Sequence, residues 1–430
     1  MNVVRMLPDL TAGRGEGFME LQNNVNRPSP PGPLDGIKVL EYGVFHAGPG
    51  AGAILGDLGA DVIKIEESQG DPERYWIRLG DLDLSLPSGE SVMFQVSNRN
   101  KRGICLDVEK QKGRDVFHRL IKRSDVFLTN LRKSTKISMG LDYATLSSVN
   151  PRIIHANVSG YGPDGPMSDL GAFDPLGLAR SGMLFVTGSR DPVLMHIGIL
   201  DQATAITASH AILTALFARE RSGKGQEVDV SLYSAGQWLM YPSLMVNNIL
   251  SREPMVREDH SEHSPLRNFF RCRDGKWIIG THHPEEKYWS LFCEITGQTD
   301  LLADPRFVDD EARAANCPEL VARFDEVFAT RTRDEWMEIF LSKGLMFCSI
   351  QHVSEIKDDP QALANGYVVD FEDKTLGKLK IPGYPVRFSA NRAGTRSLGP
   401  ALGEHTVAVL KEIGYAEQEI EDLTKEGVIG

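Results

Sequence analysis

The chain has 430 residues, and its 59 acidic residues against 47 Lys and Arg give a formal net charge of −12. This sign argues against a nucleic-acid or membrane partner, because both need a basic protein surface. No stretch approaches the roughly 18 apolar residues of a spanning helix, and the hydrophobic fraction of 41% is that of a folded protein. The five cysteines are scattered without a C-x-x-C pair, so we expect a reducing cytoplasm and no zinc site.

The first half of the chain predicts a doubly wound α/β domain over residues 33–230. Residues 1–32, rich in Asn, Gly and Pro, are expected to form a flexible extension. Beyond them, short apolar stretches alternate with helical patterns, which is typical of a parallel sheet with crossover helices. The expected strands are 37–42, 61–66, 104–108, 125–129, 152–158 and 226–232. The expected helices are 47–59, 109–123, 143–149 and 201–221.

The second half predicts a smaller α+β domain over residues 266–350. Residues 231–265 are expected to link the two domains, starting with an apolar helix at 235–250 and ending in a charged stretch. Asp274-Gly275 between two apolar segments is a strong hairpin signal. Helical patterns follow at 285–296, 318–330 and 333–343, then two extended segments around 374–377 and a helical tail at 404–423.

Two parts of the predicted sheet are suited to an anionic ligand. The turn of residues 45–52 opens a helix whose N-terminal N–H groups attract anions, although close packing of its small residues is an alternative explanation. The basic run 98–102 and the pair Arg132-Lys133 lie next to strands, either as ligand contacts or as solvated loops. Ligands of open α/β sheets sit beyond the carboxyl ends of strands.

Two acids stand out as candidates for covalent chemistry. Asp174 lies in a loop, and Asp201 opens the helix of residues 201–221. A carboxylate at that position is commonly a helix cap, but between apolar residues it can also serve as a nucleophile. The pairs His260/His263 and His282/His283 lack partner carboxylates at helical spacing, so we expect no metal site.

Ordered motifs over about residues 33–425 make the chain similar to the family III CoA-transferases, whose relatives include α-methylacyl-CoA racemase. These motifs are Pro33–Glu41, Ala47–Pro49, Leu58–Glu66, Asn100–Arg102, Gly140–Tyr143, Ser159–Gly162, Ser222–Gln226 and Leu402–Thr406. The resemblance implies a Rossmann-like large domain built from both chain ends, with residues 351–430 returning to complete it. It also implies an interlocked homodimer, with a heteromer containing a related subunit as the alternative.

The resemblance implies that CoA moves from an acyl-CoA donor to a carboxylic acid acceptor without a metal or redox cofactor. Asp201 matches the catalytic Asp, which forms a mixed anhydride and then an aspartyl-CoA thioester. Asp174 matches an acidic active-site residue of some members. The family's CoA contacts fall on His46, Ala47, Asn130 and Leu131, and charge makes Lys101 and Arg102 candidates for the phosphates.

Two alternatives remain at this point. A racemase would need a proton-carrying His where this chain has Phe173, which favours transfer. A non-catalytic CoA-binding subunit is disfavoured by the presence of Asp201. Lys133-Ser134 replaces the usual Pro-Gly, as in the branch acting on aryl acids or aryl-substituted dicarboxylic acids, so we expect an aryl-substituted or dicarboxylic acceptor.

Overall fold

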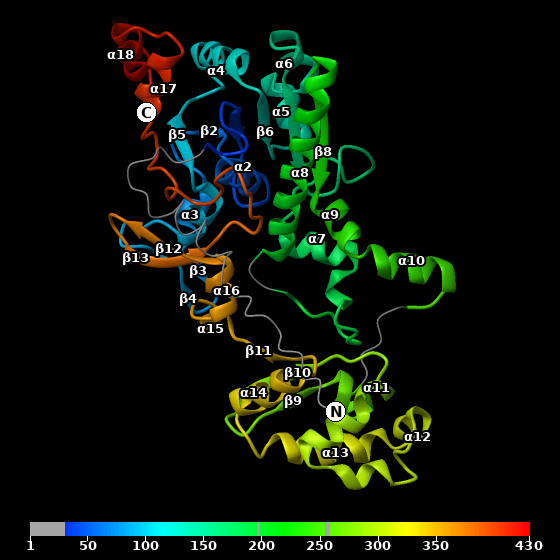
Figure 1. Cartoon of the computed structure of the whole chain (residues 1–430). Helices are drawn as coiled ribbons and strands as arrows, with labels where there is room; N and C mark the ends of the chain where they lie inside the picture. The colour runs from blue at the N-terminus through cyan, green and yellow to red at the C-terminus, as the bar shows by residue number, and fades with distance from the viewer. Residues whose placement is uncertain (1–30, 196–197, 254–258) are drawn as a thin grey trace.

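A six-stranded parallel sheet forms the centre of the larger part of the molecule (Figure 1). The computed structural model describes residues 31–195, 198–253 and 259–430, so most of the extension expected at 1–32 lies outside the described residues. The strands are β1 (Lys38–Tyr42), β2 (Asp61–Glu66), β5 (Lys101–Cys105), β6 (Val126–Thr129), β7 (Ile154–Ser159) and β8 (Gln226–Ser231). Their order β5-β2-β1-β6-β7-β8 reverses direction between β1 and β6, as in doubly wound folds. The predicted α/β class and parallel sheet are confirmed.

Hydrophobic side chains cover both faces of this sheet. Leu40 and Phe127 face one core, and Val39 and Val126 face the other, because successive side chains of a strand point to opposite sides. The helices of this part of the molecule are α2 (Ala47–Asp57), α3 (Val92–Asn98), α4 (Gln111–Arg123), α5 (Lys133–Met139), α6 (Tyr143–Val149), α7 (Asp174–Ser181) and α8 (Ile199–Ser222). Near-continuous apolar strands such as β6 are typical of a sheet buried on both faces.

The C-terminal end of the chain packs on the same sheet. Helices α17 (Thr406–Glu412) and α18 (Glu417–Lys425) place Leu410 and Leu423 in the core that contains Leu40, and they lie beside α4 in Figure 1. The chain end itself pairs with the residue after β5, through a bridge between Ile429 and Leu106.

The small residues of α2 allow it to lie very close to the sheet and to α8. A Cβ on Gly52 would lie 1.9 Å from Oε2 of Glu41, and one on Gly50 would lie 3.0 Å from the Cβ of Ala205. Close packing therefore accounts for the glycines of this turn and helix. The first turn of α2 nevertheless lies at the carboxyl end of β1, where ligands of such sheets bind.

A separate antiparallel sheet organises the smaller part of the molecule. Its order is β11-β10-β9, with β9 (Phe269–Arg271), β10 (Trp277–Gly280) and β11 (Phe347–Ile350). The predicted hairpin at Asp274-Gly275 is confirmed, with Gly275 at φ 78° in the turn. Its surrounding helices are α11 (Glu286–Thr296), α12 (Asp310–Ala315), α13 (Cys317–Phe328) and α14 (Arg333–Lys343). Its core is largely aromatic, with Phe292 and Phe324 stacked at its centre.

Short elements complete the described residues. The hairpins are β3 (Arg78–Leu79) with β4 (Leu82–Asp83), and β12 (Val368–Asp373) with β13 (Gly377–Pro382). The remaining helices are α9 (Leu232–Leu239), α10 (Tyr241–Leu250), α15 (Val353–Ile356) and α16 (Pro360–Asn365). The 3₁₀ turns are η1 (Pro72–Tyr75), η2 (Met183–Phe185), η3 (His260–Glu262), η4 (Pro265–Arg267) and η5 (Thr299–Leu302). In the described part of the chain, no helix is long and apolar enough to cross a membrane.

Several predicted elements are displaced or divided. The strand expected at 104–108 is β5 at Lys101–Cys105, because the strand begins with two cations, of which Lys101 is buried and Arg102 is partly exposed. The helix expected at 235–250 is divided into α9 and α10, with Pro242 in the first turn of α10. Helices thus occupy much of 231–265, where we expected a linker. The tail expected as one helix consists of α17 and α18.

Candidate active site

A cavity of about 1170 Å³ opens at the carboxyl ends of β1, β6 and β7. This is the point at which the strand order reverses, the usual ligand site of such a sheet. Its volume exceeds the roughly 300–1,000 Å³ of common small-molecule pockets, so it has room for a large ligand. Of the predicted site residues it brings together the following: His46, Ala47, Asn130, Leu131, Phe173 and Asp201.

Asn130 holds the turn between β1 and α2 in place. Its Oδ1 accepts a hydrogen bond from the Val44 N–H at 3.0 Å, and its Nδ2 donates to the Val44 carbonyl at 2.7 Å. A Cβ on Gly43 would lie 2.7 Å from Asn130 Oδ1, so only glycine leaves room for this clamp. The side chain of Asn130 therefore shapes the site by fixing the neighbouring turn. Leu131 lines the cavity beside it.

Phe45, in the same turn, has a backbone conformation that is rare for its residue type. Its φ of 59° lies in the left-handed region, which costs a bulky residue free energy. Its N–H donates to Oδ1 of Asp71 at 3.1 Å, and its ring meets that of Phe173 edge-on at 5.1 Å between centroids. These contacts stabilise the strained turn and bring Phe173, 59% exposed, to the wall of the cavity.

Asp201 lies in the first turn of α8 and lines the cavity. Gly198, the N-cap residue of α8, has a left-handed φ of 59°, a conformation that favours glycine. Asp174, the first residue of α7, supplies the cap that α8 lacks from its own N-cap residue. Its Oδ2 accepts from the N–H groups of Leu200 at 2.7 Å and of Asp201 at 3.0 Å. The sequence analysis missed this interaction, because residues 174 and 201 are brought together only by tertiary packing.

The same arrangement changes the acidity of Asp201. Burial, and secondarily the negative charge of Asp174, raise the pKa of the Asp201 carboxyl to about 7. A carboxylate with a raised pKa is a stronger nucleophile than an ordinary one and is still ionised at slightly alkaline pH. The helix-cap interpretation of Asp201 is wrong, because the side chain of Asp174 caps α8 while Asp201 lines the cavity.

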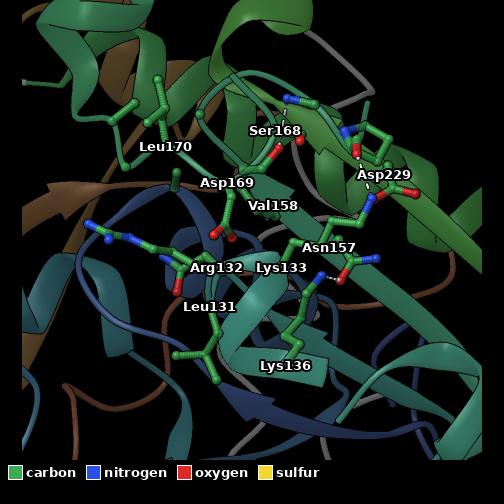
Figure 2. A pocket seen from close by; sticks show the side chains of 18 of the residues that line it. Leu131, Arg132, Lys133, Lys136, Asn157, Val158, Ser168, Asp169, Leu170 and Asp229 are labelled. Atoms are coloured by element: carbon green, nitrogen blue, oxygen red, sulfur yellow. Dashed lines mark hydrogen bonds between the residues drawn. The ribbon is translucent and has the colours of Figure 1, made fainter. Parts of the chain in front are cut away.

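Three cations from one segment line another wall of the cavity. Arg132 precedes α5, and Lys133 and Lys136 belong to its first turns (Figure 2). Lys133 donates to the Pro163 carbonyl at 3.0 Å, and Lys136 donates to Oδ1 of Asn157. Burial lowers the pKa of Lys136, while the nearby Asp229 and Glu227 oppose that shift. The described cations of this wall thus come from the segment after β6.

Lys101 and Arg102, predicted to contact phosphates, have other partners in the structure. Lys101 is buried and pairs with Glu41 at 2.7 Å beneath α2. Arg102 pairs with Asp61 and Glu412, both at 2.7 Å, on the edge strand. Neither residue lines the cavity. The expectation failed because both side chains belong to β5 itself rather than to a loop at its carboxyl end.

The histidine pairs considered for metal binding have structural contacts. His260 contacts Asp325 and Asn268, and His282 accepts from the Met346 N–H at 2.9 Å. Within residues 31–195, 198–253 and 259–430, no group of three or more His, Cys, Asp or Glu side chains is arranged to hold a metal ion.

Comparisons with known proteins identify the family of this chain. The family model for CoA-transferase family III matches residues 34–406. A Fusarium pseudograminearum protein named acyl-CoA transferase is 36% identical over 411 residues, which cover 93% of this chain and 88% of that protein. The succinyl-CoA:glutarate CoA-transferase of Mus musculus is 32% identical over 403 residues, covering 92% and 90%. The crystal structure of a CAIB/BAIF family protein from Brucella suis superposes with a TM-score of 0.80 at 29% identity, covering 89% of this chain and all of that one.

The chain therefore belongs to CoA-transferase family III and is an enzyme of that class. Enzymes of this family use CoA thioesters as substrates, and carboxylic acid acceptors are consistent with it. The resemblance stated from the sequence motifs is confirmed, and the named relatives above are transferases rather than racemases.

Proposed function

We propose that the enzyme moves CoA from an acyl-CoA donor to a carboxylic acid acceptor, with Asp201 as the nucleophile. The observation that carries this proposal is the position of Asp201: it lines the cavity, and Asp174 holds its backbone in place. The start of α2 lines the same cavity with its N-cap residue His46 and its first residue Ala47. Helix N-termini stabilise developing negative charge, such as that on a tetrahedral intermediate.

The proposed reaction returns Asp201 to its starting state in four steps. The Asp201 carboxylate attacks the thioester carbonyl carbon, the C–S bond breaks, and CoA thiolate leaves a mixed anhydride. The thiolate then attacks Cγ of Asp201, which gives an aspartyl-CoA thioester and releases the donor acid. The acceptor carboxylate attacks the same Cγ and expels the thiolate, forming a second anhydride. Attack of the thiolate on the acceptor carbonyl gives the new CoA thioester and frees the Asp201 carboxylate.

These four reaction steps require the raised pKa of Asp201 and a cavity from which water is excluded. Water in the cavity would hydrolyse either intermediate, so closure around the substrates is part of the function. The cavity is also lined by the half-buried ring of Phe45 and by the exposed side chains of Phe173 and Leu176. These apolar groups suit an acceptor with an aryl or other apolar substituent.

We place the phosphates of CoA on the segment after β6. Arg132 and Lys133 are exposed and line the cavity, and Asn130 and Leu131 precede them on the same wall. A second carboxylate on the acceptor is a further anion that Arg132 could pair with in bidentate geometry. The acceptor class proposed is therefore an aryl-substituted or dicarboxylic acid, in keeping with the glutarate in the name of the Mus musculus relative.

We also propose that the active enzyme is a homodimer. No residue of α10 is buried, and its Ile249 is 69% exposed. Trp238 of the preceding helix, α9, is 71% exposed. Helix α10 projects away from the rest of the molecule (Figure 1). Such an apolar surface is stable when a second chain covers it. Sedimentation should give twice the chain mass, whereas a heteromer would require a second, related chain for activity.

A direct assay tests the proposed activity. We expect purified enzyme to transfer CoA from succinyl-CoA or another acyl-CoA to a subset of a panel of aryl and dicarboxylic acids, as read by mass spectrometry. The Asp201→Asn variant is the matched control. Transfer by that variant at the wild-type rate would contradict the assignment. Racemisation is tested in deuterated water with a 2-methylacyl-CoA, where we expect no α-deuterium because Phe173 carries no proton.

A further inference from the structure

The turn of residues 43–45, between β1 and α2, is held by side chains from distant parts of the chain. Asn130, from the segment after β6, binds both backbone groups of Val44. From β2, Nζ of Lys64 donates to the Gly43 carbonyl at 2.8 Å. The Lys64 side chain is 0% exposed, so water does not compete for this contact. The backbone of the first two residues of the turn is therefore fixed by tertiary contacts.

The third residue of the turn, Phe45, is held by a buried carboxylate. Oδ1 of Asp71 accepts from the Phe45 N–H at 3.1 Å and from the Glu73 N–H at 3.0 Å. Oδ2 of Asp71 pairs with Nζ of Lys64 at 2.9 Å, and both side chains are 0% exposed. One buried ion pair therefore contacts the turn at both ends, with Lys64 on the carbonyl of its first residue and Asp71 on the N–H of its last.

Phe45 needs this support because its backbone is strained. Its φ of 59° lies in the left-handed region, which a bulky residue keeps only where the surrounding structure enforces it. The chain changes direction here rather than at the N-cap of α2, since His46 is already in the right-handed helical region and makes no side-chain cap. The hydrogen bond to Asp71 therefore stabilises the conformation that sets the start of α2.

The position of Phe45 also bears on Asp201. Its ring meets the ring of Phe173 edge-on, with 5.1 Å between centroids. Phe173 is the N-cap of α7, and the next residue, Asp174, caps α8 through the backbone of Asp201. The turn thus contacts both sides of the proposed reaction centre: it continues into α2 through its backbone, and it meets the start of α7 through the Phe45 ring.

We propose that Asp71 is a positioning residue for the transfer reaction, with Lys64 as its buried counter-ion. By accepting from the Phe45 N–H, it keeps the turn in the conformation that places the start of α2 and the Phe173 ring relative to Asp201. Neither Asp71 nor Lys64 lines the cavity, so any effect on catalysis passes through the turn. The catalytic consequence rests on the proposed function, whereas the conformation of the turn does not. A purely structural ion pair is the competing explanation.

Asp125 offers a matched control for Asp71. Its Oδ2 accepts from the Lys38 N–H at 2.9 Å, and its Oδ1 pairs with the buried Arg219 at 2.8 Å. Asp125 thus also combines a backbone N–H with a buried cation, but at the first residue of β1, and it does not line the cavity. Removal of either ion pair should lower the melting temperature, so stability alone does not distinguish the two.

Three double variants separate the hydrogen bond from the ion pair. Asp71→Leu/Lys64→Met and Asp71→Asn/Lys64→Met each replace both charges, which avoids leaving a buried ion unpaired. Leu and Asn are similar in size, but only the amide oxygen of Asn accepts from the Phe45 N–H. Asp125→Leu/Arg219→Met is the control.

Hydrogen exchange without substrate tests the conformation of the turn, read by mass spectrometry on overlapping peptides that isolate the Phe45 amide. We expect slow exchange of this amide in the wild type, the Asn variant and the Asp125 control. The Leu variant should exchange about tenfold faster, which corresponds to the loss of one hydrogen bond of ordinary net strength. Equal rates in the Leu and Asn variants overturn the proposal. If the Leu variant does not fold, the other two proteins still decide, because fast exchange in the wild type or in the Asn variant contradicts the proposal.

Kinetics with the same variants test the catalytic consequence. We expect the Leu variant to lose about tenfold or more in kcat per folded enzyme, with KM for the acyl-CoA nearly unchanged, since small displacements of reacting groups cost this much. The Asn variant should restore kcat to near the wild-type value, and the Asp125 control should keep it. Equal kcat in all three variants, with only the melting temperature lowered, means that the pair is purely structural and overturns the proposal. If the wild type does not transfer CoA, the proposed function fails, while the exchange result still decides the conformation of the turn.

Discussion

The side chain of Asp174 accepts hydrogen bonds from the backbone at Asp201 and not from its side chain. Oδ2 of Asp174 lies 3.0 Å from the backbone nitrogen of Asp201 and 2.7 Å from that of Leu200. One carboxylate thereby has two effects. It caps α8, and its charge helps to raise the pKa of the Asp201 carboxyl group. Because Asp174 supplies the cap of α8, the carboxyl group of Asp201 is not used as the cap and can act as the proposed nucleophile.

Removing the charge of Asp174 should shift the pH dependence of the enzyme. In Asp174→Asn the repulsion on Asp201 is lost, so the pKa of Asp201 falls and the midpoint of the kcat/KM profile moves to lower pH. The weaker cap should cost about 1 kcal/mol of stability. Asp359→Asn is the matched control, because Asp359 also accepts from two backbone N–H groups at a helix start but does not line the cavity. An equal pH shift in both variants would contradict the account.

The wild-type activity should itself rise with pH. Because the pKa of Asp201 is raised to about 7, the fraction of ionised nucleophile in the free enzyme increases through pH 7 and levels off about one unit above it. We expect kcat/KM to follow a single ionisation with that midpoint. A profile that is flat between pH 5 and 9 would show that Asp201 is already ionised at low pH.

The same shift should appear in stability. Between the unfolded pKa near 4 and the folded pKa near 7, the folded state holds a proton on Asp201 that the unfolded state has lost, so stability falls as pH rises. The slope from this one group is at most about 1.4 kcal/mol per pH unit. Asp201→Asn lacks it, so its melting temperature should exceed that of the wild type by more at pH 7.5 than at pH 5. A constant difference would argue against the raised pKa.

Cations of the cavity wall should affect substrate binding, and buried ones should affect folding. Arg132→Gln and Lys133→Gln should each raise KM for the acyl-CoA by about tenfold, the scale of one charge-assisted phosphate contact. Lys122→Gln, on the exposed end of α4, is the control and should leave KM unchanged. Equal KM values in all three variants would place the CoA phosphates elsewhere.

In contrast to the cavity-wall variants, Lys101→Met should lower the stability of the enzyme and leave KM unchanged. It leaves Glu41 buried with a weaker, 3.4 Å contact to Lys64 as its remaining cation. Breaking a buried pair from one side typically costs about 3–5 kcal/mol. We therefore expect a large fall in melting temperature, with KM for the acyl-CoA of the folded fraction unchanged. A raised KM without loss of stability would restore Lys101 as a phosphate contact.

Local patterns predicted most of the sheet but not the contacts that build the site. Apolar runs located β1, β2 and β6 to within about a residue, because strands buried on both faces have a strong signal. The pattern misplaced β5, since its first residue is a lysine whose buried partner, Glu41, is 60 residues away. The helix α7 was missed, since it is short and starts at Asp174-Pro175 within a Gly-rich segment.

The sequence predicted only part of the candidate site, again because local patterns do not reveal contacts between residues that are distant in the chain. Asp201 was recognised from family motifs, and the structure puts it in the cavity with His46, Ala47, Asn130 and Leu131. The cap from Asp174 joins residues 26 and 27 positions apart, and the contact of His46 with Gln202 joins residues 156 positions apart. No local spacing encodes such contacts, because they arise only when the helices pack on the sheet.

The covalent intermediate on Asp201 tests the central claim most directly. The enzyme is incubated with an acyl-CoA donor and no acceptor, quenched in acid, digested and analysed by mass spectrometry. We expect the peptide that contains Asp201 to gain the mass of CoA less one water, and Asp201→Asn to show no such peptide. Full turnover by wild-type enzyme with an unmodified Asp201 peptide, or with CoA attached to another residue, would contradict the account.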